Sequence, residues 1–213
     1  MYQPPHFIET DRDVLHALIR AHPLGLLISA TPDGPVADPV PMLLDADEGQ
    51  HGRLRAHVAR ANAHWKIIRD TPEMPVLVVF QGADSYVTPS WYETKRETGK
   101  VVPTWNYATV QVRGKARAIE DTAWIGQQIR ELTGKHEASR VEPWAVEDAP
   151  ERYIEAQLRG IVGIEIDIGE IHGKWKVSQN RPEADRVGVA EGLAGIEGAA
   201  EMTALVRRYG KLG

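Results

Sequence analysis

The chain has 213 residues, of which 42% are hydrophobic and 26% are charged, enough for one globular domain with a core of ordinary size. It contains no cysteine, so disulfides, thiolate metal sites and cysteine nucleophiles are excluded. The formal net charge of −5 disfavours a general affinity for nucleic acid.

The first residues, Met1–His6, lack the basic start and the apolar run that a signal peptide needs. No apolar run approaches the roughly 20 residues that a membrane-spanning helix requires. We therefore expect a cytoplasmic protein that has no membrane partner.

The first predicted element is a helix that begins within Thr10–Asp13, which reads as an N-cap with acids in the first turn, and that stops at Pro23. A short apolar strand follows over Leu24–Ala30. Thr31–Gly34 then predicts a turn, because Pro pre-sets the backbone and Gly accepts positive φ. The next strand runs to Leu44, and its three prolines predict an edge or a bulge.

Arg53–His57 predicts a third strand, and Asn62–Asp70 a short helix. Pro75–Phe80 is continuously apolar and β-branched, which indicates a buried strand, and Ser85–Thr88 indicates another. We expect Pro89–Pro103 to be an irregular aromatic loop.

A long strand is predicted over Asn106–Ile119, followed by a helix that Asp121 caps and that runs to His136. A shorter helix is expected over Pro150–Leu158, and Ile161–Ile168 alternates as a half-buried strand does. Because six or seven strands follow one another with few helices between them, the sequence predicts a mainly β protein, an antiparallel barrel with peripheral helices. We place a first domain at residues 1–180 and a helical extension at 181–213.

The most informative segment is Gly49–Arg69, twenty-one residues without a single acid in an acidic chain. At its centre, His57–Asn62 reads as a strand end and a turn before a helix, where amides and Arg60 can hold an anion. A short basic run in an acidic chain suits one phosphate group better than a nucleic-acid backbone. The alternative is a solvated, capped surface helix.

Two further segments could contact a ligand. Ser85–Tyr92 and Val102–Tyr107 combine aromatic rings with Pro and hydroxyls, which can stack on a planar ligand or form an oligomer interface. Lys174–Arg181 is a basic segment that could bind an anion or form an ordinary polar loop. The sequence has no hydrolase elbow, phosphate loop or dinucleotide fingerprint, and no His pair with metal-ligand spacing. We therefore assign no catalytic residue and predict no metal.

Four segments in order resemble the PaiB-like family of FMN-binding negative transcriptional regulators, and the similarity extends to about Gly195. Any one of them is weakly specific, whereas four in the same order are strongly so. The sequence departs from the family where Asp38-Pro39 stand in place of a Ser/Thr-His pair. The segments are His57–Asn62, Tyr86–Tyr92 with Lys95, Val102–Tyr107 and Lys176–Arg181.

The resemblance implies a split β-barrel of the flavin reductase and pyridoxine-phosphate oxidase type, a homodimer with FMN at the subunit interface. It implies that Ala59, Arg60 and Asn62 hold the phosphate, with His57 and Val58 lining the adjacent strand. The residues that it brings to the flavin are Trp105, Asn106, Gln179 and Asn180.

Two functions are consistent with that resemblance. The first is an FMN-binding negative regulator of transcription that acts without direct DNA binding, because no recognition helix is evident. The second is an FMN-dependent oxidoreductase, or flavin reductase, that uses NAD(P)H. The residues alone do not name a substrate or an electron donor.

Overall fold

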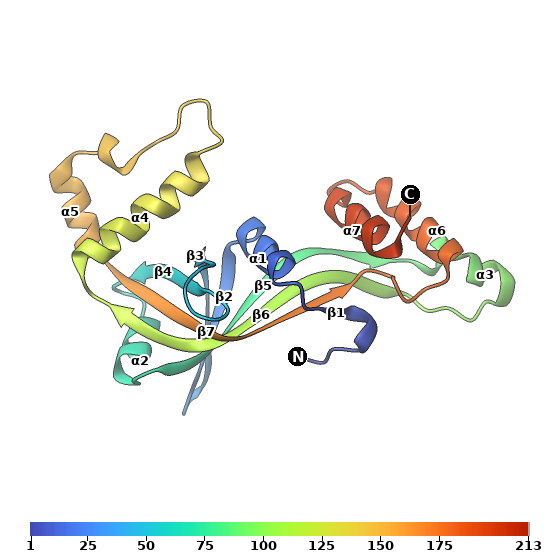
Figure 1. Cartoon of the computed structure of the whole chain (residues 1–213), viewed down its shortest axis with the longest axis horizontal. Coiled ribbons are helices and arrows are strands. Elements are labelled where there is room, and N and C mark those ends of the chain that lie inside the picture. The colour runs from blue at the N-terminus through green and yellow to red at the C-terminus, as the bar shows by residue number, and fades with distance from the viewer. Residues whose placement is uncertain (213) are drawn as a thin grey trace. The chain divides into compact units, whose positions relative to one another are not determined.

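The computed structural model describes residues 1–212 (Figure 1). The chain forms two compact units, and three long strands, β5, β6 and β7, contribute residues to both. We call Ile19–Phe80 with Gln111–Ile171 the barrel unit. We call Met1–Leu18, Gln81–Val110 and the chain from His172 onward the terminal unit.

The strands pair in the order β1-β7-β4-β3-β2-β5-β6, and β6 also pairs with β7. Six strands, β2 to β7, therefore close on one another, and β1 adds to β7. This ring confirms the predicted mainly β barrel. The strands are β1 (Ile8–Glu9), β2 (Leu24–Thr31), β3 (Gly34–Asp45), β4 (Arg53–Ala59), β5 (Met74–Val87), β6 (Thr104–Ile119) and β7 (Ile161–Lys176).

The prolines of β3 lie in the half of the strand that pairs with only one neighbouring strand, β2. In the antiparallel register, residues Gly34–Pro41 pair with β2, whereas Met42–Asp45 pair with β4. Proline cannot donate to a ladder and is therefore tolerated on the side of a strand that has no partner. The predicted edge position holds for this half of β3, although the whole strand lies between β2 and β4.

The core of the barrel unit is built from inward-facing aliphatic and aromatic side chains. Leu27, Val78, Phe80, Ile164 and Ile166 are fully buried. Their alternation along the strands is the period of two that a one-sided sheet core requires. Helices of this unit are α2 (His64–Asp70), α4 (Thr122–Glu137) and α5 (Glu151–Arg159), with a 3₁₀ turn η3 (Val146–Asp148).

Aspartates cap two helices: Asp121 is the cap that the sequence predicts, and Asp11 is the capping residue within the predicted start Thr10–Asp13. The carboxylate of Asp11 accepts a hydrogen bond from the amide of Asp13 at 2.9 Å, and Asp121 accepts one from the amide of Trp124 at 2.7 Å. Each cap satisfies an amide that has no partner inside its helix. Asp11 precedes α1 (Arg12–Ala21), and Asp121 precedes α4.

The structure corrects two expectations about residues 75–103. Pro75–Phe80 and Ser85–Thr88 lie almost wholly in one continuous strand, β5. The predicted loop after β5 contains a 3₁₀ turn and a helix, since Thr88 caps the turn and Gly99 ends the helix at φ 68°. The elements of the terminal unit outside the sheet are η1 (Pro5–Phe7), most of α1, η2 (Pro89–Trp91), α3 (Glu93–Thr98), α6 (Glu183–Ala194) and α7 (Ala200–Gly210).

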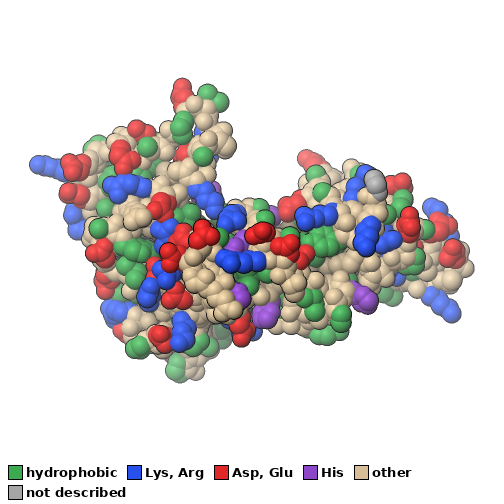
Figure 2. All heavy atoms as spheres, viewed as in Figure 1, with side chains coloured by type: hydrophobic (Ala, Val, Ile, Leu, Met, Phe, Trp, Pro, Cys, Tyr) green, Lys and Arg blue, Asp and Glu red, His purple; other side chains and the backbone are tan. Residues whose placement is uncertain are grey.

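Within residues 1–212, no helix is both long and apolar enough to cross a membrane. On the face that Figure 2 shows, acidic and basic side chains are interspersed. The predicted boundary between residues 180 and 181 stays a prediction.

Candidate functional site

The turn between β4 and α2 carries small side chains at the surface. The amide of Arg60 donates to the carbonyl of Gly160 at 2.8 Å, which fixes the start of the turn to the C-terminal end of α5. Ala59, Ala61 and Ala63 are all exposed, and each has only a methyl side chain. A ligand can therefore approach the main chain of this turn more closely than larger side chains would allow.

Asn62 holds the end of the turn. Its Oδ1 accepts a hydrogen bond from the amide of His64 at 2.8 Å, an Asx turn that leads into α2. Its Nδ2 has no acceptor among residues 1–212. The side chain thus supports the backbone through one atom and offers two N–H donors to solvent through the other.

Three cations surround the ring of Trp65, a residue that is itself 4% exposed. The charged groups of Arg60, Lys66 and Arg69 lie 5.5, 6.0 and 4.9 Å from the ring centre. Arg69 pairs with Asp70, whereas Lys66 forms no ion pair with a described residue. Lys66 was not among the sequence-predicted site residues, although it lies in the same acid-free segment.

Arg60 is not free in the structure. Its Nη1 donates to Glu120 at 2.6 Å, and its Nε donates to the carbonyl of Arg159 at 3.1 Å. The side chain is 40% exposed, so solvent weakens the ion pair. A phosphate at the turn would compete with Glu120 for the guanidinium.

His57 and Val58 lie on β4 but point in different directions. Val58 is buried in the core at 7% exposure. His57 donates from Nδ1 to Oε1 of Gln128 at 2.7 Å, which leaves its Nε2 as an acceptor. The Nε2 of Gln128 is buried and has no hydrogen-bond partner. This orphaned donor, held by α4 beside His57, is the kind of group that a ligand or a water satisfies.

A buried network missed by the sequence analysis lies next to the turn. His64 donates from Nδ1 to Asp38 at 2.8 Å, and its Nε2 accepts from the hydroxyl of Ser29 at 2.7 Å. Asp38 is the residue at which the chain departs from the family pattern, and here its carboxylate engages His64. The residue types match a hydrolase triad, but Ser29 is 0% exposed, so no substrate reaches it.

The other predicted ligand residues lie in the terminal unit. Trp105 is 55% exposed, and its ring meets Tyr86 edge-on at 6.0 Å between centres. Asn106 is 1% exposed, and its Nδ2 donates to Oγ of Ser178 at 3.0 Å. Trp105 therefore presents a ring to solvent, whereas Asn106 holds a loop.

Gln179 closes the turn after β7. Its Oε1 accepts from the amide of Val177 at 2.8 Å, and its Nε2 donates to the carbonyl of Trp175 at 2.5 Å. Ser178 has a φ of 66°, a left-handed conformation that these bonds help to hold. The amide of Gln179 is thus used within its own turn, while Asn180 is exposed.

The structure brings His57, Val58, Ala59, Arg60 and Asn62 together in the barrel unit. It brings Trp105, Asn106, Gln179 and Asn180 together in the terminal unit.

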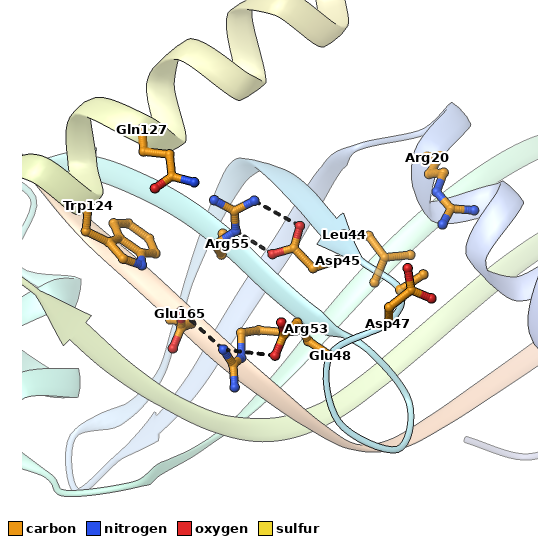
Figure 3. Close-up of a pocket in the computed structure, with 11 residues that line it drawn as sticks. Arg20, Leu44, Asp45, Asp47, Glu48, Arg53, Arg55, Trp124, Gln127 and Glu165 are labelled. Atoms are coloured by element: carbon orange, nitrogen blue, oxygen red, sulfur yellow. Dashed lines mark hydrogen bonds and ion pairs between the residues drawn. The ribbon is translucent and has the colours of Figure 1, made fainter.

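A charged cleft of about 600 Å³ also lies in the barrel unit (Figure 3). Arg55 forms two hydrogen bonds to Asp45, which raise the pKa of its guanidinium, and Arg53 lies between Glu48 and Glu165. Acids already neutralise both arginines, so the cleft is a poor site for a phosphate.

Residues 1–170 match the family described as "Putative FMN-binding domain". An uncharacterised protein of Emericella nidulans is 36% identical, with all of this chain and 98% of that protein aligned. The "Protease synthase and sporulation protein PAI 2" of Bacillus subtilis is 29% identical over 92% of this chain and 91% of its own length.

Solved structures show the same fold at low identity. The flavocytochrome Anf3 of Azotobacter vinelandii gives a TM-score of 0.56 at 16% identity, over 79% of this chain and 69% of that one. A FAD and heme binding protein of Mycobacterium smegmatis gives 0.57 at 18% identity, over 79% and 73%. The strand order and these neighbours establish the split β-barrel.

The residues at the β4–α2 turn fit FMN at its phosphate end. The turn offers small exposed alanines, the two unused donors of Asn62 and the ammonium of Lys66, which forms no ion pair with a described residue. These are hydrogen-bond donors and a cation, which is the set that a phosphate monoester requires.

Proposed function

The chain belongs to the PaiB-like family of FMN-binding proteins, and from that membership we propose that its β4–α2 turn holds the FMN phosphate. Ala59, Arg60 and Asn62 contact the phosphate, and His57 and Val58 line the strand beside it. The observation that carries this proposal is the open turn, in which Asn62 fixes the backbone with one atom and keeps its donors free.

At the flavin end, the proposal assigns direct contact to Trp105 and Asn180, which are exposed. Asn106 and Gln179 act through the turn at Ser178 that they hold. We further propose a homodimer in which each FMN lies at the subunit interface. Bound FMN supplies redox chemistry, and the residues of this chain bind and orient it.

Arg60 and Glu120 give a matched test of the phosphate position. Arg60→Ala removes a cation from the turn, so we expect weaker FMN binding, measured by quenching of flavin fluorescence. Glu120→Gln frees the guanidinium while keeping its side chain's shape, so FMN binding should stay as tight or become tighter. If both variants bind FMN like the parent chain, Arg60 only fastens the turn to the C-terminal end of α5, and its phosphate role is wrong.

The proposed biological role is negative regulation of transcription without direct contact to DNA. The net charge of −5 and the interspersed charges of Figure 2 favour a protein that acts through a metabolite, a partner or its redox state. A gel-shift experiment at low salt should show no tight, sequence-specific complex. Such a complex, persisting against competitor DNA, would overturn the indirect role.

An FMN-dependent oxidoreductase that uses NAD(P)H is the second candidate. It is favoured by the exposed rings of Tyr86 and Trp105, on which a second planar molecule can stack. NADH or NADPH, added anaerobically to the FMN-loaded protein, should bleach the flavin absorption if this candidate is correct. The absence of bleaching with either nucleotide counts against it.

A further inference from the structure

Two lysines of the terminal unit lack a carboxylate partner. Lys174 and Lys176 are two positions apart on β7, so their side chains project from the same face of the strand. Lys174 is only 8% exposed, yet no acid among residues 1–212 forms an ion pair with it or with Lys176. A buried ammonium without an anion is costly, so the arrangement calls for a physical reason.

Aromatic rings and neutral oxygens supply part of the missing interaction. The Nζ of Lys174 lies 5.2 Å from the ring centre of Tyr107 and 5.5 Å from that of Tyr2. Lys176 donates to the hydroxyl of Thr104 and to the carbonyl of Trp105. These contacts orient the two ammonium groups without cancelling their charge.

A third cation increases the positive potential in this unit. The guanidinium of Arg181 lies 4.5 Å from the ring centre of Tyr92 and also has no carboxylate partner in the described chain. Burial, together with the charges of Lys174 and Arg181, lowers the pKa of Lys176. An anion placed here would relieve the mutual repulsion of the cations.

Aromatic rings on the strand beside the lysines and at the N-terminus present flat surfaces to solvent. Trp105 and Tyr107 are two positions apart on β6, the strand that pairs with β7, so they lie on the same face of it. Trp105 is 55% exposed. Tyr2 is 82% exposed although its ring contacts Lys174. Large rings that stay open to solvent beside a cation favour a planar ligand carrying a negative charge.

We propose that Lys174 and Lys176, with the rings of Tyr2 and Tyr107, form a second ligand site that binds a planar aromatic molecule bearing an anionic group. This site shares no residue with those proposed for FMN, and it does not depend on where the FMN phosphate lies. It would let an aromatic anion bind while FMN is present.

The test compares 2-naphthoate with its neutral analogue 2-naphthamide by isothermal titration calorimetry. Both are titrated into the full chain with FMN and without FMN, and flavin loading is followed separately by absorption. The variants are Lys174→Met and Lys176→Met, which keep the aliphatic stem and remove the charge. Lys100→Met is the control, because Lys100 is exposed in the same unit and forms no ion pair in the described chain.

We expect 2-naphthoate to bind in both states, and the amide at least about tenfold more weakly. Each site variant should weaken naphthoate binding about tenfold, whereas Lys100→Met leaves it unchanged. Melting temperatures identify a variant that fails to fold. If Lys174→Met proves unstable, the test rests on Lys176→Met, because Lys176 is less buried than Lys174. Equal binding of acid and amide, or equal loss in the control, overturns the proposal. Displacement of naphthoate by FMN, mole for mole, also overturns it, since the lysines then belong to the flavin site.

Discussion

In Asn62, one side-chain atom supports the local backbone and another is proposed to contact the ligand. Its Oδ1 holds the amide of His64, and its Nδ2 is free to donate to a phosphate. An aspartate at this position keeps the acceptor oxygen and replaces the donors with negative charge. The two roles can therefore be measured one at a time.

We predict that Asn62→Asp keeps the melting temperature of the FMN-free protein and weakens FMN binding by about tenfold or more. Asn62→Ala loses both roles, with a cost in unfolding free energy of about 1 kcal/mol. Thermal melting and fluorescence titration measure the two effects. If Asn62→Asp binds FMN as the parent does, the phosphate does not contact this side chain.

The network of Ser29, His64 and Asp38 should contribute stability rather than catalysis. Both Ser29 and the side chain of His64 are fully buried, so removing either partner leaves an unsatisfied polar group. We predict that Ser29→Ala lowers the unfolding free energy by about 1–3 kcal/mol in a urea titration. A neutral effect would mean that water replaces the hydroxyl.

The sequence could locate these residues only in part. Asn62 stands out because an amide in a turn before a helix is a recognisable pattern. The partner of Arg60, Glu120, is sixty positions away in the sequence, and nothing local indicates it. The network around His64 is hidden for the same reason, since Ser29 on β2 and Asp38 on β3 are distant from it in the sequence.

At the scale of elements, α4 is held against β4 by a shared arginine. Arg55 donates to Asp45 and also to Glu131 on α4. Burial opposes ionisation of Glu131, but hydrogen bonds from Gln127 and Arg55 outweigh it, so the pKa of this carboxyl lies below its usual value. A carboxyl with a lowered pKa in the folded state adds stability at higher pH.

A double-mutant cycle with Arg55→Met and Glu131→Gln should give a coupling energy of about 1–3 kcal/mol near neutral pH. The sign for Glu131 follows from its lowered pKa: its contribution is complete above the usual value of 4.5 and is lost as pH falls through the lower folded value. Urea unfolding across that range measures the change. A coupling that does not weaken in acid would contradict the ion pair.

Glycines allow α6 to approach η2. A Cβ on Gly188 would lie 2.0 Å from the carbonyl oxygen of Trp91, and one on Gly192 would lie 2.3 Å from its ring. We predict that Gly188→Ala lowers the unfolding free energy by about 1–3 kcal/mol. Gly134→Ala in α4 is the control: no atom lies within 4 Å of the added methyl, so helix propensity should raise stability by about 0.5–1 kcal/mol.

The elements themselves show what sequence patterns capture. Capping residues mark helix starts because the cap is a local interaction: Asp121 caps α4 as predicted, and Asp11 caps α1 within the predicted start Thr10–Asp13. The polar stretch Gln81–Asp84 hid the continuity of β5, since its exposed residues resemble a loop. Sheet pairing supplies hydrogen bonds there that no local pattern reveals.

At the scale of the whole molecule, we predict a homodimer that binds FMN. Sedimentation equilibrium should give twice the mass of one chain, with and without FMN. A protein that remains monomeric while it binds FMN tightly would remove the subunit interface from the proposed site. The barrel and the family membership would be unaffected by that result.

If the proposal is correct, this barrel binds FMN through its phosphate at the β4–α2 turn. The most direct measurement compares FMN with riboflavin, which has the same ring and no phosphate, by fluorescence titration of the parent chain and of Asn62→Asp. We predict that the parent chain prefers FMN by about tenfold or more and that Asn62→Asp abolishes most of this preference. Equal affinity for the two flavins in the parent chain, or no binding of either, would contradict it.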